Sequence, residues 1–169
     1  KTDLDKAFDV PSILEKAVEI EKELSVIVVK NEKGEISVFP TVELVFDPVY
    51  NLVDYLISPA NISELQDKTG KELAMKVCIA LDSEGIFAVE LFLDKSGNIL
   101  VNETAPRTHN SGHHTIESCA SSQFDQQLRA LLNLPLGDTS LRKKAAMVNI
   151  VGEENFDGKV IYQGLEEIL

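Results

Sequence analysis

Two glutamates flank a predicted hairpin turn and could hold a divalent cation between them. Glu90 lies in an alternating apolar run, and Glu103 ends the stretch that follows the turn-forming residues 94–98. If that turn pairs the two strands, both carboxylates share a face and repel unless a proton or a cation lies between them. With the amide oxygen of Asn102, they form an all-oxygen site of the kind that suits Mg²⁺. The alternative is that Glu90 lies at a solvated edge and Glu103 merely ends a strand, because a one-residue slip in register would separate them.

The loop after Glu103 concentrates the imidazole groups of the chain. His109, His113 and His114 are its only histidines, lie within six positions and closely follow Arg107. An arginine can grip a carboxylate or phosphate through two parallel hydrogen bonds, and a histidine can donate to an anion or move a proton near neutral pH. These residue types favour an anion site. A transition-metal site and a loop whose histidines only pack locally are the two alternatives.

Composition limits the classes of function that need to be considered. The chain has 169 residues, is 44% hydrophobic and carries a net charge of −12, which suits one ordinary domain and opposes nucleic acid or an anionic membrane as a partner. No apolar run is long enough to cross a bilayer, and no signal peptide opens the chain. Neither a glycine-rich phosphate loop nor a Gly-x-Ser-x-Gly motif is present. Cys78 and Cys119 are predicted to be helical, buried thiols of a reducing compartment.

Hydrophobic periodicity predicts an α+β layer fold in which hairpins alternate with helices. The expected elements are a hairpin over 12–40, a helix over 62–81, a hairpin over 86–103, a helix that opens at Ser122 and stops before Pro135, and a buried strand over 146–151. The expected apolar stripes are Ile62, Leu65, Leu73, Val77, Ala80 and Leu81 on the first helix, and Phe124, Leu128, Leu131 and Leu132 on the second.

Several runs together resemble the ATPase subunit of phosphoribosylaminoimidazole carboxylase, also called carboxyaminoimidazole ribonucleotide synthetase, within the ATP-grasp superfamily. The most specific run is 102–113, Asn-Glu-Thr-Ala-Pro-Arg-Thr-His-Asn-Ser-Gly-His, and it follows the run 87–92. The segments 15–18, 23–26 and 121–129 are similar to the same family. The resemblance covers the chain from about Val10. It implies the C-terminal part of an ATP-grasp domain, mainly antiparallel sheet with packed helices.

The resemblance also implies a role for each matching residue. Glu15, Lys16, Ala17 and Val18 match the hinge that contacts adenine, and Glu23 matches the residue that accepts hydrogen bonds from the ribose hydroxyls. Glu90 and Glu103 match the Mg²⁺ ligands, with Asn102 beside them, and Asn102 and Glu103 also belong to the nucleotide site. Arg107 and His109 match the catalytic residues that hold bicarbonate or the carboxylated product.

The implied activity is that of an ADP-forming carbon–nitrogen ligase. Such an enzyme activates bicarbonate with ATP, through carboxyphosphate, and carboxylates 5-aminoimidazole ribonucleotide to N5-carboxyaminoimidazole ribonucleotide in de novo purine biosynthesis. The expected cofactors are ATP and Mg²⁺, and the expected setting is a cytoplasmic homodimer without nucleic acid or membrane partners. Two alternatives stay open: an ATP-grasp ligase for another amine acceptor, such as glycinamide ribonucleotide or a biotin carrier, and a non-catalytic histidine-rich module that binds a metal.

The resemblance further implies that this chain holds part of a larger site. Residues 1–10 are expected to be the tail of an upstream lid, 11–151 the ATP-grasp catalytic subdomain, and 152–169 the start of a small C-terminal domain. The family's N-terminal nucleotide-fold domain, its lid lysines and a basic segment beyond Leu169 are not in the sequence, so the chain alone is expected to be inactive. Family members often carry proline where this chain has Thr108, which we expect to loosen the loop without removing its charged groups.

Overall fold

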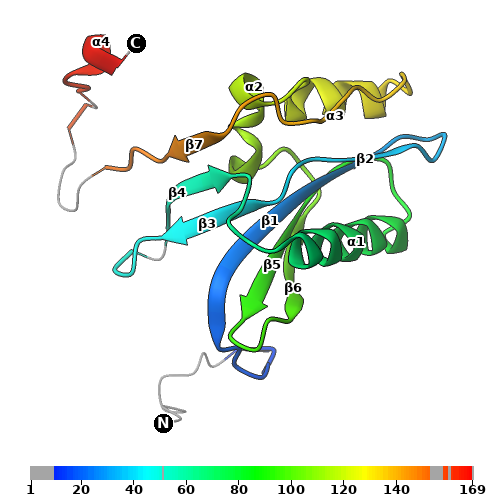
Figure 1. Ribbon diagram of the computed structural model, residues 1–169, viewed down its shortest axis with the longest axis horizontal. Helices are drawn as coiled ribbons and strands as arrows, with labels where there is room; N and C mark the ends of the chain where they lie inside the picture. The colour runs from blue at the N-terminus through cyan, green and yellow to red at the C-terminus, as the bar shows by residue number, and fades with distance from the viewer. Residues whose placement is uncertain (1–9, 51, 153–157, 160, 169) are drawn as a thin grey trace.

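The central feature of the fold is one antiparallel sheet. The computed structural model describes residues 10–50, 52–152, 158–159 and 161–168 of the chain. Within them seven strands pair in the order β6-β5-β1-β3-β4-β7, and β2 pairs with β1 beside β3 (Figure 1). The strands are β1 (Ile20–Lys30), β2 (Ile36–Val38), β3 (Val42–Phe46), β4 (Val53–Ser58), β5 (Gly85–Asp94), β6 (Ile99–Ala105) and β7 (Ala145–Val148). The predicted α+β class with a mainly antiparallel sheet is confirmed.

Helices cover both faces of the sheet. They are α1 (Glu64–Ala80), α2 (Thr115–Ser118), α3 (Gln123–Leu131) and α4 (Leu165–Ile168), with a 3-10 turn at Asn110–Gly112. One hydrophobic cluster joins α1 to one set of alternate residues of β1 and β5, and a second joins the other set to residues around α2 and α3. Because side chains alternate along a strand, these clusters lie on opposite faces of the sheet.

The second predicted hairpin is confirmed as β5–β6, and its turn shows why. The carboxylate of Asp94 accepts hydrogen bonds from the backbone N–H groups of Ser96 at 2.9 Å and Asn98 at 2.8 Å. Gly97 has φ of +85°, a conformation that glycine adopts without steric cost. The side-chain amide of Asn98 also donates to this carboxylate, and this hydrogen bond, followed by those from the backbone, holds the pKa of the Asp94 carboxyl below its usual range. The turn therefore sets the register of the strands that carry both candidate metal ligands.

The first hairpin is confirmed only in part. Strands β1 and β2 pair antiparallel around a turn at 31–34, as the sequence predicts. The prediction that strand structure begins near Ser12 is wrong, because β1 starts at Ile20 and residues 12–19 have no regular structure. Ile13 and Leu14 are 88% and 98% exposed, so neither side chain packs against the sheet.

Both predicted long helices exist, but their buried faces differ from the predicted stripes. Helix α1 buries its small residues Gly70, Ala74 and Cys78. Of the predicted stripe, Ile62, Leu73 and Val77 are partly buried against the same cluster, whereas Leu65 is 74% exposed. Helix α3 is capped by Ser122 as predicted, yet it buries Gln123, Gln126 and Ala130. The four apolar residues of its predicted stripe are instead 39–66% exposed: Phe124, Leu128, Leu131 and Leu132. Close approach of helix to sheet favours small side chains, and the buried glutamines of α3 are held by hydrogen bonds.

The last predicted strand is correct in place but not in burial. Strand β7 ends at Val148 and lies at one edge of the sheet, where it pairs only with β4. Val148 is 64% exposed, so the prediction of a buried strand is wrong for this edge. Strands β3 and β4 were not predicted from the sequence. Cys78 and Cys119 are buried free thiols as predicted, although Cys119 follows α2 rather than lying in a helix.

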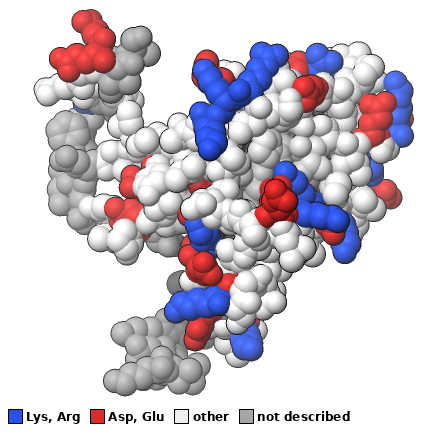
Figure 2. All heavy atoms as spheres, in the orientation of Figure 1, with Lys and Arg blue, Asp and Glu red and all other residues white. Residues whose placement is uncertain are grey.

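Two surface observations bear on the predicted partners. No helix in the described ranges is long and apolar enough to cross a membrane. On the face shown in Figure 2, acidic and basic side chains are interspersed.

A matched pair of substitutions tests which apolar face holds the fold together. Leu91→Ala removes a side chain that is 1% exposed in the cluster under α1, and we expect the free energy of unfolding to fall by about 2–5 kcal/mol. Leu128→Ala truncates a side chain that is 60% exposed on α3, and we expect a change within about 0.5 kcal/mol. Urea denaturation of both variants makes the comparison. Equal losses would show that the exposed stripe of α3 is buried in solution.

Candidate functional site

The floor of the candidate site is one face of strands β1, β5 and β6. Ser25 of β1 lies directly opposite Glu90 of β5, and Ala88 of β5 lies opposite Ala105 of β6. Glu103 is two residues before Ala105, and Glu90 is two residues after Ala88. Side chains two residues apart share a face. The Glu90 and Glu103 carboxylates therefore project from the same side of neighbouring strands.

An irregularity in the β5–β6 pairing lies at the predicted metal site. Val89 pairs with Thr104 and Leu91 pairs with Val101, so Asn102 and Glu103 together oppose the single residue Glu90. An extra residue of this kind leaves part of the ladder unpaired and redirects side chains locally. The bulge places the Asn102–Glu103 pair beside Glu90. The register of the two strands does shift by one residue here, but the shift is a bulge that keeps Glu103 and Asn102 beside Glu90.

The carboxylates of the site oppose one another electrostatically. Burial raises the pKa of Glu90, and the negative charges of Glu103 and then Glu23 raise it further. Burial also raises the pKa of Glu23. Glu23 lies on β1 opposite Phe92, on the same face as Ser25 and Glu90. A cation placed among these groups would relieve both the repulsion and the loss of hydration.

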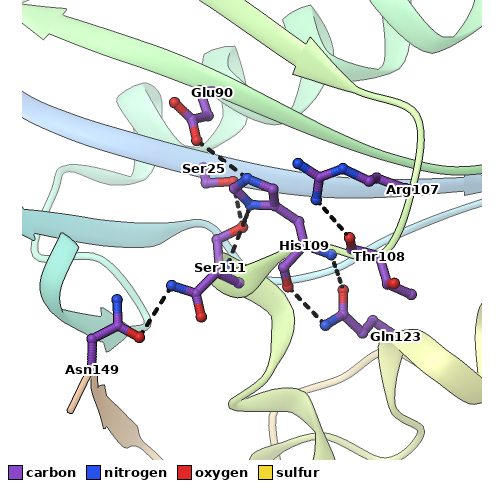
Figure 3. A network of polar contacts seen from close by, with 9 residues as sticks. Ser25, Glu90, Arg107, Thr108, His109, Ser111, Gln123 and Asn149 are labelled. Carbon is purple, nitrogen blue, oxygen red and sulfur yellow. Dashed lines mark hydrogen bonds and ion pairs between the residues drawn. The ribbon is translucent and has the colours of Figure 1, made fainter. Parts of the chain in front are cut away.

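His109 lies against this cluster and is held from two sides (Figure 3). Its Nε2 is 3.5 Å from Glu90 Oε1, and its Nδ1 is 2.9 Å from the hydroxyl of Ser111. That hydroxyl lies 2.8 Å from the hydroxyl of Ser25. Burial lowers the pKa of His109, and the charge of Arg107 lowers it further while Glu103 opposes the shift. A neutral imidazole therefore faces the Glu90 carboxylate near neutral pH, so the contact is polar rather than a full ion pair.

Two amide side chains fix the loop that carries His109. The Gln123 side chain, which is 0% exposed, accepts from the His109 backbone N–H at 3.0 Å and donates to the His109 carbonyl at 2.8 Å. The Asn110 amide donates to the side-chain oxygen of Asn149 at 3.2 Å. Asn149 in turn donates to the carbonyl of Val53 at 2.6 Å. The loop is thus attached both to α3 and to the β4–β7 edge of the sheet.

Arg107 lies at the exposed side of the same loop. Its guanidinium donates to the carbonyl of Thr108 at 3.0 Å and lies beside His109 in Figure 3. Within the described residues no carboxylate forms an ion pair with it. An exposed guanidinium next to a neutral imidazole donor can seat a small anion.

The segment predicted to contact adenine lines an open groove on the same side of the sheet. Residues 15–18 face Phe92, Leu100 and Asn102 across a hollow of about 710 Å³. Phe92 shares its face with Glu90, because the two residues are two positions apart on β5. The structure therefore brings residues 15–18, Asn102 and the carboxylates to adjoining parts of one surface, and Glu23 lies opposite Phe92 within it.

The three histidines have separate environments. The ring of His113 stacks on Phe124 with centroids 5.8 Å apart, and His114 Nδ1 is 2.8 Å from the Ser118 hydroxyl. In the described part of the chain, no group of three or more His, Cys, Asp or Glu residues has the geometry to hold a metal ion. This arrangement gives no support to a histidine-rich transition-metal module. It leaves room for Mg²⁺, which takes one or two carboxylates together with phosphates and water.

The chemistry of the donors fits Mg²⁺. Glu90 and Glu103 supply oxygen ligands from adjacent strands, and the pKa of Glu90 is raised first by burial and then by the charges of Glu103 and Glu23. Asn102 supplies a neutral amide oxygen at the same bulge. An acidic cluster next to an open groove can accept a cation that also contacts phosphates in the groove.

Comparison with known proteins assigns the family. The ATP-grasp domain family matches residues 2–124, and the chain belongs to this family. The resemblance predicted from the 102–113 run is confirmed by relatives that bear the name of that subfamily. Among them are the chloroplastic phosphoribosylaminoimidazole carboxylase of Vigna aconitifolia, 49% identical over 87% of this chain, and the N5-carboxyaminoimidazole ribonucleotide synthase of Bacillus subtilis, 46% identical over 84%.

Solved structures agree with the sequence comparison. The N5-carboxyaminoimidazole ribonucleotide synthetase of Thermotoga maritima matches 98% of this chain and 44% of its own with a TM-score of 0.89 and 53% identity. The Aspergillus clavatus enzyme, solved with ADP and 5-aminoimidazole ribonucleotide, matches 82% of this chain and 37% of its own with a TM-score of 0.77 and 42% identity. The chain spans 26% of the Vigna relative and 37% of the Bacillus relative, so it corresponds to a part of those proteins.

Three polar residues of the site were not singled out from the sequence. Ser25, Ser111 and Gln123 are 1%, 2% and 0% exposed and connect to His109 directly or through one hydroxyl. Ser25 interrupts an otherwise apolar run of β1, and that interruption is a signal that could have marked it. Gln123 occupies the first turn of an amphipathic helix, where its type alone predicts exposure.

Gly112 packs closely against the sheet and against α3. A β-carbon there would collide with Ile27 Cδ1 and with Gln123 Oε1. We expect Gly112→Ala to lower the free energy of unfolding by about 1–3 kcal/mol and to disturb the Gln123 contact with His109. Gly152→Ala is the control, since a β-carbon there meets nothing within 4 Å. Thermal denaturation compares them, and equal stability of the two variants would contradict this close packing.

His114 gives the fold a defined dependence on pH. Burial lowers its pKa to about 4 from the ordinary 6.5. The unfolded chain then binds more protons than the folded chain between these values, so stability is complete above about pH 6.5 and falls as the pH drops toward 4. The loss attributable to His114 should be about 3 kcal/mol. Urea titrations at several pH values should show a shallower acid slope in His114→Asn, and identical slopes would exclude this origin.

Proposed function

We propose that this chain forms the nucleotide- and bicarbonate-binding part of a ligase that carboxylates 5-aminoimidazole ribonucleotide to N5-carboxyaminoimidazole ribonucleotide at the expense of ATP. The observation that carries the proposal is the meeting of the Glu90–Glu103 bulge with the Arg107–His109 loop. A carboxylate pair and a cationic anion pocket are the two parts that phosphate activation of bicarbonate requires. The names of the relatives from Bacillus subtilis and Vigna aconitifolia support the same reaction.

The groove supplies the nucleotide site in this proposal. Residues 15–18 and the side chains of Phe92 and Leu100 offer backbone groups and apolar surface to a purine ring. Glu23 lies on the adjoining strand, where its carboxylate can accept hydrogen bonds from ribose hydroxyls. The Aspergillus clavatus relative has also been solved with ATP, which supports a nucleotide in the equivalent fold.

Glu90 and Glu103 would hold Mg²⁺ at the phosphate end of this groove, with Asn102 beside them. Bound there, the cation would neutralise charge on the phosphates as it develops during transfer. The two carboxylates contribute a fixed position, because they project from paired strands whose opposite face is packed under α1. A cation bound there would offset the burial of Glu90 and its repulsion by Glu103 and Glu23, which together raise the pKa of Glu90.

Arg107 and His109 would seat bicarbonate and then the carboxylated intermediate. The Arg107 guanidinium offers two parallel donors to a carboxylate, and the neutral His109 ring adds a further N–H donor. Donors that are already oriented stabilise negative charge without the cost of reorganisation. The loop geometry that Gln123 fixes would therefore hold these donors in place for the amine of the nucleotide to attack.

The rest of the sequence-based account stays a set of predictions. The division into 1–10, 11–151 and 152–169 is not tested by the structure, and residues 1–9 and 153–157 lie outside its described ranges. A homodimer, a cytoplasmic setting and inactivity of this chain alone are likewise predictions. The substrate assignment over another amine acceptor depends on the 102–113 run and on the relatives that share the proposed reaction.

The proposed metal site is tested by phosphate release from ATP in bicarbonate buffer. With the complete gene product, we expect release to depend on 5-aminoimidazole ribonucleotide and to fall by roughly 100-fold or more in Glu103→Ala, because a phosphate-bridging cation loses a ligand. Glu72→Ala is the matched control, since Glu72 is a half-exposed acid on α1, across the sheet from the site. Unchanged turnover in Glu103→Ala would sink the metal assignment, and comparable turnover with glycinamide ribonucleotide would overturn the substrate.

A further inference from the structure

A buried line of hydroxyl groups runs from the sheet to the ring of His109. Ser25 projects from β1 opposite Glu90, and its hydroxyl lies 2.8 Å from that of Ser111. The Ser111 hydroxyl lies 2.9 Å from His109 Nδ1 (Figure 3). Both serines are at most 2% exposed, so bulk solvent does not reach these groups. Buried hydroxyls that bond to one another and to a ring nitrogen form a network whose donor directions are interdependent.

The backbone determines the direction of this line. The N–H of Ser111 donates to His109 Nδ1 at 3.3 Å, and a backbone N–H can only donate. Nδ1 therefore accepts and carries no hydrogen in the neutral ring, which leaves the ring hydrogen on Nε2. The Ser111 hydroxyl then donates to Nδ1 and accepts from the Ser25 hydroxyl. The resulting Nε2–H points toward Glu90 Oε1, 3.5 Å away.

His114 provides an internal comparison with the opposite arrangement. The Ser118 hydroxyl donates to the backbone carbonyl of His114 at 2.7 Å, so its hydrogen is already in use. The same hydroxyl lies 2.8 Å from His114 Nδ1 and accepts from it. His114 should therefore carry its hydrogen on Nδ1, whereas His109 carries it on Nε2. One loop would hold two neutral histidines in different tautomers, each set by a buried serine.

We propose that Ser111, oriented by Ser25, is a positioning residue that fixes His109 as the Nε2–H tautomer and so presents a hydrogen-bond donor to the carboxylate and anion site. A ring with its hydrogen on Nδ1 would turn a lone pair toward Glu90 and repel both that carboxylate and a bound anion. The tautomer itself follows from the contacts of the chain alone. Its consequence for turnover rests on the proposed function.

The tautomer is tested without substrate. Full-length protein is labelled with ¹⁵N in its histidine rings, and the His109 signals are assigned by their loss in His109→Gln. At about pH 8, above the ordinary histidine pKa near 6.5, two-bond ¹H–¹⁵N spectra separate ring nitrogens with and without hydrogen. We expect His109 as Nε2–H in the native protein. Ser111→Ala keeps the backbone N–H donor at 3.3 Å and removes only the hydroxyl donor at 2.9 Å, so we expect Nε2–H still to dominate but with a detectable Nδ1–H population. Ser118→Ala is the matched buried control and should alter only His114. A native His109 in the Nδ1–H form, or a spectrum unchanged by Ser111→Ala, overturns the proposal.

The consequence for turnover is tested by a double-mutant cycle in the phosphate-release assay. Ser111→Ala should lower turnover by about 10- to 100-fold, as loss of a group that orients a ligand typically does. In a His109→Ala background the same substitution should have less than about a 2-fold effect, because the ring it orients is gone. Equal losses in both backgrounds would mean that Ser111 acts on the fold and not through His109. If the complete protein fails to carboxylate the proposed nucleotide while the tautomer result stands, only the proposed function is lost.

Discussion

Repulsion among carboxylates on one face of the sheet is the constraint to which the rest of the site responds. Glu23, Glu90 and Glu103 project from three neighbouring strands, and Glu90 feels the charge of both others. In an isolated strand such carboxylates would point into solvent. Here the opposite faces of β1 and β5 are packed under α1, so the strands cannot rotate to expose them. The apolar cluster under α1 stabilises the pairing of these strands, and that pairing keeps the three carboxylates close together. The stability of the core therefore maintains an electrostatically unfavourable arrangement that a bound cation would reverse.

One part of that face is covered by helices and another part lines the open groove. Around Ile27 and Ala88 the face is covered by the region of α2 and α3, and around Phe92 it is open. The loop that carries Arg107 and His109 lies between the two parts. Its inner side is anchored by Gln123 and by close packing at Gly112, while Arg107 stays exposed. A single short segment can thus be rigid at the imidazole and accessible at the guanidinium.

The sequence predicted the second hairpin better than it predicted the packing of the helices. The β5–β6 hairpin could be derived because Asp94 and Gly97 specify the turn locally. The bulge opposite Glu90 could not, since its energy depends on pairing across strands. The buried face of α3 was predicted wrongly. Its apolar residues Leu128 and Leu131 are exposed, whereas Gln126 is buried and its side-chain amide donates to the Ser121 hydroxyl. Strands β3 and β4 were not predicted. Apolar and polar residues alternate in this segment, as in Val42-Glu43-Leu44, but the pattern is weaker than the signals of the two hairpins.

The bond between Asn110 and Asn149 ties the functional loop to the outermost strand of the sheet. Asn149 also donates from its backbone to Asp54 and from its amide to Val53, so it fastens the end of β7 to β4. An edge strand of four residues is the part of a sheet that opens most readily. Fraying of β7 would release the Asn110 side chain at the same moment, and backbone amides in this loop would exchange with solvent together with those of the strand. The rate of hydrogen exchange in the loop that carries His109 would then depend on how often the edge strand β7 opens.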